Sequence, residues 1–266
     1  MPWLTGTAFL HSVMIQEKRG MFKRWNMILV ILTYALVIFG TFLTRSGVLS
    51  SVHAFAQSAI GPLFFIFIGI TFAISLKLLF RGWERLYSEN MLTSWLSREG
   101  LFLLNNLLFM GILLACFWGV IYPLISELAT GQKVTVGPPF YERTTGPQFA
   151  ALLFLMGVAP LAAWRVTTVR RLGNIIWKPT VFSLLAPLCV LIAGVTNPAA
   201  LLSLWLTGLV FCVTMYEFFR GASARRKSTG DNILRALYDL IALNRRRYGG
   251  YVIHLGVVLM AVGIIG

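Results

Sequence analysis

The fold of this 266-residue chain follows from the stretch Asn26–Thr44, N-M-I-L-V-I-L-T-Y-A-L-V-I-F-G-T-F-L-T, which contains no charged residue. A helix needs about 20 predominantly apolar residues to cross the hydrocarbon core of a bilayer, and this stretch has that length. The rest of the chain is similar, because 58% of all residues are hydrophobic and only 12% are charged. Soluble domains carry about 25% charged residues. The sequence therefore predicts an integral membrane protein.

Working outward from this stretch, apolar runs recur along the whole chain and predict about eight transmembrane helices. The expected segments are Pro2–Gln16, Asn26–Thr44, Pro62–Phe80, Leu101–Ile121, Phe149–Trp164, Val181–Val195, Ala200–Phe219 and Tyr251–Ile265. Because long apolar runs of this kind form helices in a membrane, the expected fold class is all-α: a polytopic helix bundle forming a single membrane domain over residues 1–266.

The basic residues set the expected orientation. The net charge of +14 would suit a nucleic-acid-binding protein, but all except three of the 23 Lys and Arg residues gather in alternate loops, as the positive-inside rule requires. The three exceptions are Arg45, Lys133 and Arg143. We therefore expect the basic loops to be cytoplasmic and the amino terminus to be external. Contact with anionic lipid accounts for the charge, and nucleic-acid binding is not predicted.

Three segments between the spans have a distinct character. Residues 45–58 carry Val48, Leu49, Val52 and Phe55 at helical spacing, which predicts a short amphipathic helix on the external face. Residues 123–148 are expected to form an external loop, and the Gly- and Pro-punctuated part Ser126–Gln148 is expected to be irregular, with room for one short strand.

The third segment, residues 220–249, is expected to be cytoplasmic, basic and amphipathic. Its apolar positions Ile233, Leu234, Leu237, Leu240 and Ile241 fall on one helical face, and an Arg triplet follows. Asp231 or Asn232 can cap the start of this helix. Plain anchoring to the inner surface and a regulatory role both fit such a helix.

Three histidines are the first candidates for a functional site. Ionisable side chains at membrane depth are costly, and they usually have a purpose there. His11 lies in the first apolar segment and His254 in the last, where a helix-to-helix hydrogen bond is the alternative to ligand binding. His53 lies on the predicted external helix and could equally be an interfacial residue facing lipid headgroups. Imidazole is also a common axial ligand of haem iron.

Two further residues near the external boundary could contact a ligand. Arg45 ends the second apolar segment, where it could serve as an interfacial anchor or pair with a ligand carboxylate. Trp3 could belong to an aromatic belt or stack on a flat cofactor. The catalytic residues stay unassigned.

The remaining polar residues suggest no conventional enzyme. No phosphate-binding glycine loop or Ser/His/Asp order is present. The cysteines stand alone in apolar segments and are read as small hydrophobic residues: Cys116, Cys189 and Cys212. Acidic residues number nine and fall mostly in loops. Glu127, Glu142 and Glu217 are each interpreted as a solvated or interfacial charge.

Three stretches carry a resemblance to a known family: M-P-W-L-T-G-T-A-F-L-H-S (Met1–Ser12), T-F-L-T-R-S-G-V-L-S-S-V-H-A-F (Thr41–Phe55) and G-G-Y-V-I-H-L-G-V-V-L (Gly249–Leu259). In their order and in the spacing of their histidines they resemble the CcmF-type cytochrome c haem lyase family. The family's tryptophan-rich motif should end almost where Met1 begins, and the family continues past the last apolar segment. The chain is therefore expected to be a fragment that lacks both regions.

The resemblance implies a set of haem-binding residues. In that family a periplasmic histidine pair binds haem, and the matching positions are His11 and His53. A stable haem b is held by a transmembrane histidine pair, of which His254 matches one member and the other would lie upstream. His11 lies ten residues from Met1, about 15 Å along a helix. Sharing one iron with His53 then requires the first helix to start outside the membrane, or the His53 segment to dip inward.

The resemblance also implies an activity, partners and a location. The expected enzyme is a haem lyase of the bacterial inner membrane, which attaches haem vinyl groups to the Cys-x-x-Cys-His thiols of apocytochrome c on the external face. Its expected partners are the haem chaperone CcmE, apocytochrome c and CcmH- or CcmI-like membrane proteins. A haem transporter or conduit, and a non-catalytic assembly scaffold, are the alternatives from other functional classes.

Overall fold

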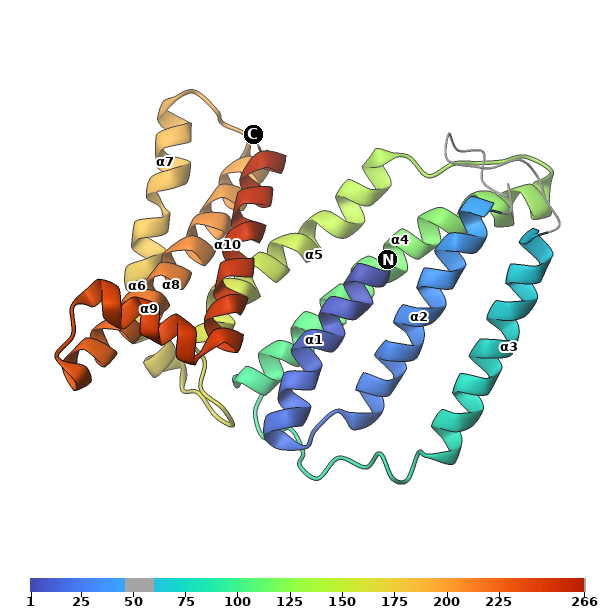
Figure 1. Ribbon diagram of the computed structural model, residues 1–266. Helices are drawn as coiled ribbons and strands as arrows, with labels where there is room; N and C mark the ends of the chain where they lie inside the picture. Colours follow the sequence, from blue (N-terminus) through green and yellow to red (C-terminus); the bar gives the residue numbers. More distant parts are fainter. Residues whose placement is uncertain (46–59, 266) are drawn as a thin grey trace. The chain divides into compact units, whose positions relative to one another are not determined.

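The computed structural model describes residues 1–45 and 60–265, and every regular element in these ranges is helical (Figure 1). The elements are α1 (Pro2–Arg19), α2 (Lys23–Arg45), α3 (Ile60–Arg81), α4 (Arg98–Thr130), α5 (Pro138–Val158), the short 3₁₀ helix η1 (Ala159–Leu161), α6 (Val169–Ser183), α7 (Leu185–Ile192), α8 (Pro198–Thr229), α9 (Ile233–Leu243) and α10 (Arg245–Ile265). The all-α prediction is confirmed.

Helices lie at all eight predicted spans, and seven stretches of the described chain are long and apolar enough to cross a membrane. Helix α1 is not one of them, because its last turn consists of polar and charged residues. The predicted span Val181–Val195 begins much earlier in the structure: α6 and α7 together form one membrane-length stretch, Val169–Ile192. The chain is a multi-pass membrane protein.

Two segments expected to be loops are largely helical. The irregular segment predicted at Ser126–Gln148 is reduced to residues 131–137, because α4 continues through Pro123 to Thr130 and α5 starts at Pro138. Proline in the first turn of a helix loses no hydrogen bond, and a proline inside a membrane helix is tolerated with local adjustment. The external position of 123–148 stays a prediction.

In the basic segment 220–249, the helix α8 runs on to Thr229, and the predicted amphipathic helix is confirmed as α9. Asn232 occupies the cap position of α9 but makes no capping hydrogen bond with its side chain. The predicted external helix at 45–58 lies outside the described residues, apart from Arg45, the last residue of α2. The cytoplasmic location of 220–249 is not tested by the fold.

By their internal contacts the residues divide into two compact units, and the single membrane domain expected for residues 1–266 stays a prediction. The first is Met1–Leu92 with Phe102–Gly146, and the second is Thr93–Leu101 with Pro147–Gly266. Each unit places one of the candidate histidines, so they are described separately.

In the first unit, α2 packs between α1 and α3. The close approach of α1 and α2 is fixed by hydrogen bonds between their side chains: Thr33 Oγ1 donates to Thr5 Oγ1 (2.7 Å), and Asn26 Nδ2 donates to Gln16 Oε1 (2.6 Å). Helix α1 ends at Gly20, which has φ 63° and donates its N–H to Gln16 O. Glycine adopts this left-handed cap conformation without strain.

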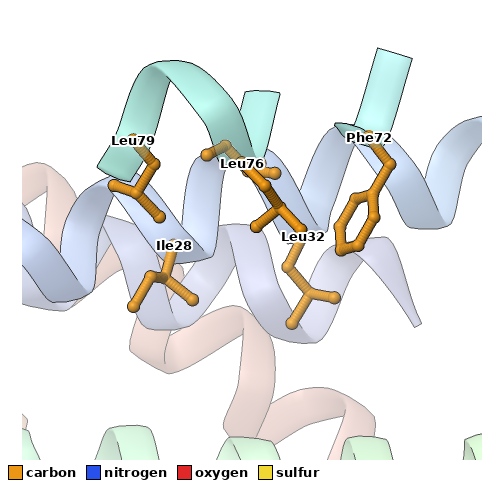
Figure 2. A pocket seen from close by; sticks show the side chains of 6 residues that line it. Ile28, Leu32, Phe72, Leu76 and Leu79 are labelled. Atoms are coloured by element: carbon orange, nitrogen blue, oxygen red, sulfur yellow. The ribbon is translucent and has the colours of Figure 1, made fainter. Parts of the chain in front are cut away.

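A small apolar hollow of about 90 Å³ lies between α2 and α3 (Figure 2). Its lining is entirely aliphatic or aromatic: Ile28, Ile31, Leu32, Phe72, Leu76 and Leu79. It offers no donor, acceptor or metal ligand, so it is not a candidate for the functional site.

In the second unit, α8 is the central helix and contacts α6, α7, α9, α10 and η1. Its apolar centre consists of Leu209 and Val213, packed against Leu161. Helix α8 begins where Asn197 caps it by accepting hydrogen bonds from two backbone N–H groups, and it ends at Gly230 with φ 78°. These two caps are the strongest start and stop signals for a helix.

Candidate functional site

His11 lies on the face of α1 that carries aromatic contacts to α4. The edge of its imidazole meets the Phe102 ring at a centroid distance of 5.6 Å, and Phe109 lies 6.2 Å away. Trp3, two turns earlier on α1, also meets Phe109 edge to face at 6.2 Å, and 63% of its surface is exposed. The structure therefore brings Trp3 and His11 together along one aromatic strip of α4.

The hydrogen bond of His11 fixes which ring nitrogen can bind a metal. Nδ1 lies 2.8 Å from Thr7 O, and a carbonyl oxygen can only accept a hydrogen bond. The neutral ring therefore carries its proton on Nδ1, and Nε2 keeps the lone pair. Metal-binding histidines commonly have such a backbone bond to the second nitrogen. His11 therefore fits the role of an axial haem ligand.

The side-chain bonds between α1 and α2 also give the depth of His11. It lies between Thr5, which meets Thr33, and Gln16, which meets Asn26, so its level on α2 is near Val30. Arg45 is then about 23 Å away along α2 at 1.5 Å per residue. A haem shared with His53 would require His53 to reach that depth. His53 lies outside the described residues, so its part in the pair stays a prediction.

Asn106 on α4 is a buried polar residue of this site that the sequence analysis did not single out. In the amide orientation that satisfies both neighbours, its nitrogen donates to Ala8 O (3.0 Å) and its oxygen accepts from Trp25 Nε1 (3.2 Å). One amide thus links α4 to both α1 and α2. The signal was available in the sequence, because an uncompensated amide inside an apolar helix is costly.

Arg45 ends α2 with an exposed side chain. Either of its predicted roles, as an interfacial anchor or as a partner of a carboxylate, is compatible with that position.

His254 lies in α10, half-buried, with its ring 6.4 Å from the Tyr251 ring on the preceding turn. Tyr251 in turn meets Phe218 of α8 edge to face at 5.9 Å and Tyr248 at 5.6 Å. The histidine therefore stands at the end of an aromatic cluster that joins α10 to α8.

The structure corrects the prediction made for Glu217 of α8. This residue was interpreted as a solvated or interfacial charge, but only 1% of its surface is exposed. Arg247 Nη2 donates to its carboxylate at 2.7 Å, Arg220 approaches at 2.9 Å, and the Tyr251 hydroxyl donates at 3.3 Å. A buried carboxylate is tolerated only with such partners. The main partner, Arg247, lies 30 residues away along the chain, so no local pattern revealed it.

Close packing beside Glu217 fixes α9 and α10 against α8. A side chain on Gly221 would overlap the Tyr248 hydroxyl and would lie 2.8 Å from Leu240 Cδ2 of α9. Glycine at this position therefore allows three helices to approach one another. This junction, together with the ion pairs of Glu217, sets the position of the first turns of α10, from which His254 projects.

The described residues do not meet the requirements of a conventional metal centre. Within residues 1–45 and 60–265, no group of three or more His, Cys, Asp or Glu side chains could hold a metal ion. Haem needs only one or two axial side chains from the protein, and the roles of His11 and His254 as such ligands stay predictions.

The fold and these residues define a class: a multi-pass helical membrane protein that has, among its described residues, one histidine in each of its two helix groups. No family model matches the chain. It is 34% identical, over its whole length, to the cytochrome c-type biogenesis protein CcmF of Pseudomonas aeruginosa, covering 39% of that protein. It is 42% identical over 165 residues to CycK of Bradyrhizobium diazoefficiens, which is 62% of this chain and 25% of that protein.

A solved structure described as cytochrome c heme lyase CcmF aligns with 99% of this chain at a TM-score of 0.72 and 32% identity. The alignment covers 37% of that structure. The chain belongs to the CcmF-type family of cytochrome c biogenesis proteins. It spans less than half the length of the relatives that it matches over its whole length.

Proposed function

We propose that the protein containing this chain takes part in cytochrome c maturation as a haem lyase, that His11 and His53 are axial ligands of the external haem, and that His254 is an axial ligand of a transmembrane haem b. The observation that carries the proposal is the Nδ1 hydrogen bond of His11 to Thr7 O at 2.8 Å, which leaves Nε2 as the metal-binding nitrogen. The relatives' names, as biogenesis proteins and as a haem lyase, support the same reaction class.

The reaction joins substrate haem to apocytochrome c. Each thiol of a Cys-x-x-Cys-His motif adds across one vinyl group, so that sulfur bonds to one vinyl carbon and hydrogen to the other. The addition has no leaving group and no net change in oxidation state. The protein's contribution is to hold the two reactants in register, and proximity alone can account for several kcal/mol of the barrier.

The external residues of the proposal handle this substrate haem. His53 provides an axial ligand on the external face, Arg45 pairs with an acidic group of the haem, and Trp3 contacts its flat surface. A resident haem b, when bound, supplies electrons that keep the substrate iron reduced. The haem chaperone CcmE delivers the substrate, and CcmH- or CcmI-like proteins present the apocytochrome, at the outer face of a bacterial inner membrane with the basic loops in the cytoplasm.

A maturation assay tests the proposal. The full-length gene is expressed in a bacterium that lacks its own CcmF-type protein, and covalent haem on a c-type cytochrome is measured by haem staining after denaturing electrophoresis. The wild type should restore covalent haem, and the His11→Ala and His254→Ala variants should lose nearly all of it. Normal maturation in both variants would contradict the ligand roles. Haem accumulation in sealed vesicles without apocytochrome would instead favour a transporter.

A further inference from the structure

The cluster around Glu217 contains more positive than negative charge. Arg220 and Arg247 contact its carboxylate directly, and Arg98, at the start of α4, lies close enough to interact electrostatically with Glu217 and Arg247. Within this set of four residues, one carboxylate faces three guanidinium groups. Arg98 is also fixed in place, because its Nη2 donates to Pro160 O at 2.7 Å. Such a preorganised excess of Arg is typical of a site for a carboxylate or phosphate.

The arginines retain capacity for another anion. Arg247 uses Nη2 for Glu217 and Nε for the Tyr251 hydroxyl, and a guanidinium has five N–H donors. Side-chain exposure is 47% for Arg247 and 46% for Arg220, whereas it is 1% for Glu217. The buried Glu217 carboxylate therefore orients the two guanidinium groups, whose remaining N–H groups stay accessible to a ligand.

The position of this cluster relative to His254 indicates which anion the arginines could bind. Arg247, Tyr251 and His254 are separated by four and three residues, so they share one face of α10. Seven residues correspond to a rise of about 10.5 Å between Arg247 and His254. Haem b carries two carboxylate groups at one edge of its ring, and for a haem held by His254 the arginine on this face would be the partner of that edge.

We propose that Arg247 and Arg220 form a carboxylate-binding site for the acidic groups of a haem ligated by His254. This inference rests on the proposed function of His254. Glu217 and Tyr251 act as positioning residues, because they hold the guanidinium groups and do not themselves bind the ligand.

The test follows the haem signal that is lost in His254→Ala in purified full-length protein. Arg247→Gln removes one guanidinium and should weaken retention of that haem roughly tenfold, as expected for one charge-assisted hydrogen bond. It should also lower the midpoint potential, because a nearby positive charge favours the reduced iron. The matched control is Arg246→Gln, with the same change of charge on the adjacent residue of α10, and it should alter neither quantity.

A chemical variant of the ligand keeps the test independent of protein stability. Haem-depleted wild-type protein is reconstituted with haem or with haem dimethyl ester, in which both carboxylates are neutral. The wild type should prefer haem roughly tenfold, and Arg247→Gln should lose this preference. Equal binding of the two by the wild type, or equal retention by Arg247→Gln and Arg246→Gln, would overturn the site while leaving the role of His254 intact.

Two other outcomes would also overturn the site. Retention of all haem by His254→Ala would overturn the haem assignment of His254 and, with it, this inference. The other outcome concerns phosphate, which could come from a lipid headgroup. If Arg247→Gln reduced binding to phosphatidylglycerol vesicles, relative to phosphatidylcholine vesicles, without changing haem retention, the cluster would be a lipid site.

Discussion

His11 and His254 both lie on helices of apolar sequence, but the two units surround them with different chemistry. His11 is placed by uncharged groups: a backbone carbonyl, two phenylalanine rings and the hydroxyl pair that joins α1 to α2. His254 stands one turn from a tyrosine that is bonded to a buried carboxylate and its arginines. The comparison teaches that a membrane histidine can be positioned by uncharged contacts or by a charged cluster. Mutations that remove these two kinds of contact should lower the free energy of unfolding by different amounts.

Mutation of the charged cluster around Glu217 should have the largest effect on the free energy of unfolding. Glu217→Ala removes the carboxylate that Arg220 and Arg247 contact, and because both guanidinium groups are about half exposed the cost is about 2–3 kcal/mol, below that of a fully buried pair. The measurement is the free energy of unfolding in mixed detergent micelles, followed by tryptophan fluorescence.

Glu127→Ala is the control for this prediction. Glu127 is 54% exposed and lies 3.9 Å from Lys133, so removing it should cost less than about 1 kcal/mol. Equal losses for the two variants would show that burial of Glu217 contributes nothing, and the contrast between the units would disappear.

The second effect concerns the close packing beside the charges. In Gly221→Ala the new methyl group meets Tyr248 and Leu240, and overpacking of this kind costs about 1–3 kcal/mol. In Gly249→Ala the methyl group enters open space on α10, and the better helix propensity should stabilise by up to about 1 kcal/mol. The change in the free energy of unfolding should therefore have opposite signs in the two variants. Two changes of the same sign would contradict the close packing of α8, α9 and α10 at Gly221.

Much of the fold could be predicted from the sequence, because long apolar runs have only one stable arrangement in lipid, namely helices. The ends of the helices could not. Helix α8 has 32 residues and is about 48 Å long, whereas the hydrocarbon core is about 30 Å thick. Its last turns therefore consist of polar residues that carry no apolar signal, and they were assigned to a loop.

The candidate site shows the same limit. The rarity of histidine in apolar segments was enough to single out His11 and His254. The partners of Glu217 were not visible, because Arg247 and Tyr251 approach it only after α10 folds back onto α8. The depth of His11 also needed the structure, since it follows from two hydrogen bonds between different helices.

Loss of the uncharged hydrogen bond between α1 and α2 in the first unit should lower the free energy of unfolding by less. Thr33→Val removes the hydroxyl that donates to Thr5, and interhelical hydrogen bonds in membrane proteins contribute about 0.6 kcal/mol on average. The control is Thr41→Val, whose hydroxyl donates within its own helix, to Val37 O, and which should cost less. A loss from Thr33→Val as large as that from Glu217→Ala would reverse the comparison between the two units.

The smallest effect is expected at the surface of the first unit. Lys23 Nζ lies 2.6 Å from Glu89 Oε1, and this hydrogen bond and the charge of Lys23 lower the pKa of the Glu89 carboxyl. A lowered folded-state pKa adds stability above the unfolded pKa, and this stability is lost as the pH falls through the folded value. Lys23→Gln should return the Glu89 pKa toward its usual range, as measured by NMR titration. Because the pair is exposed, 0.5 M salt should largely abolish the difference, and a difference that persists would contradict this assignment.

The most direct test of haem ligation is reduced-minus-oxidised absorption spectroscopy of the purified full-length protein, with haem content per polypeptide measured in parallel. Two surface variants, Glu127→Ala and Arg246→Gln, serve as controls. We predict a b-type signal in the wild type and both controls, and a partial loss of this signal, with a matching fall in haem content, in His11→Ala and in His254→Ala, each alone, because each histidine ligates its own haem. An undiminished signal in both histidine variants would contradict the account.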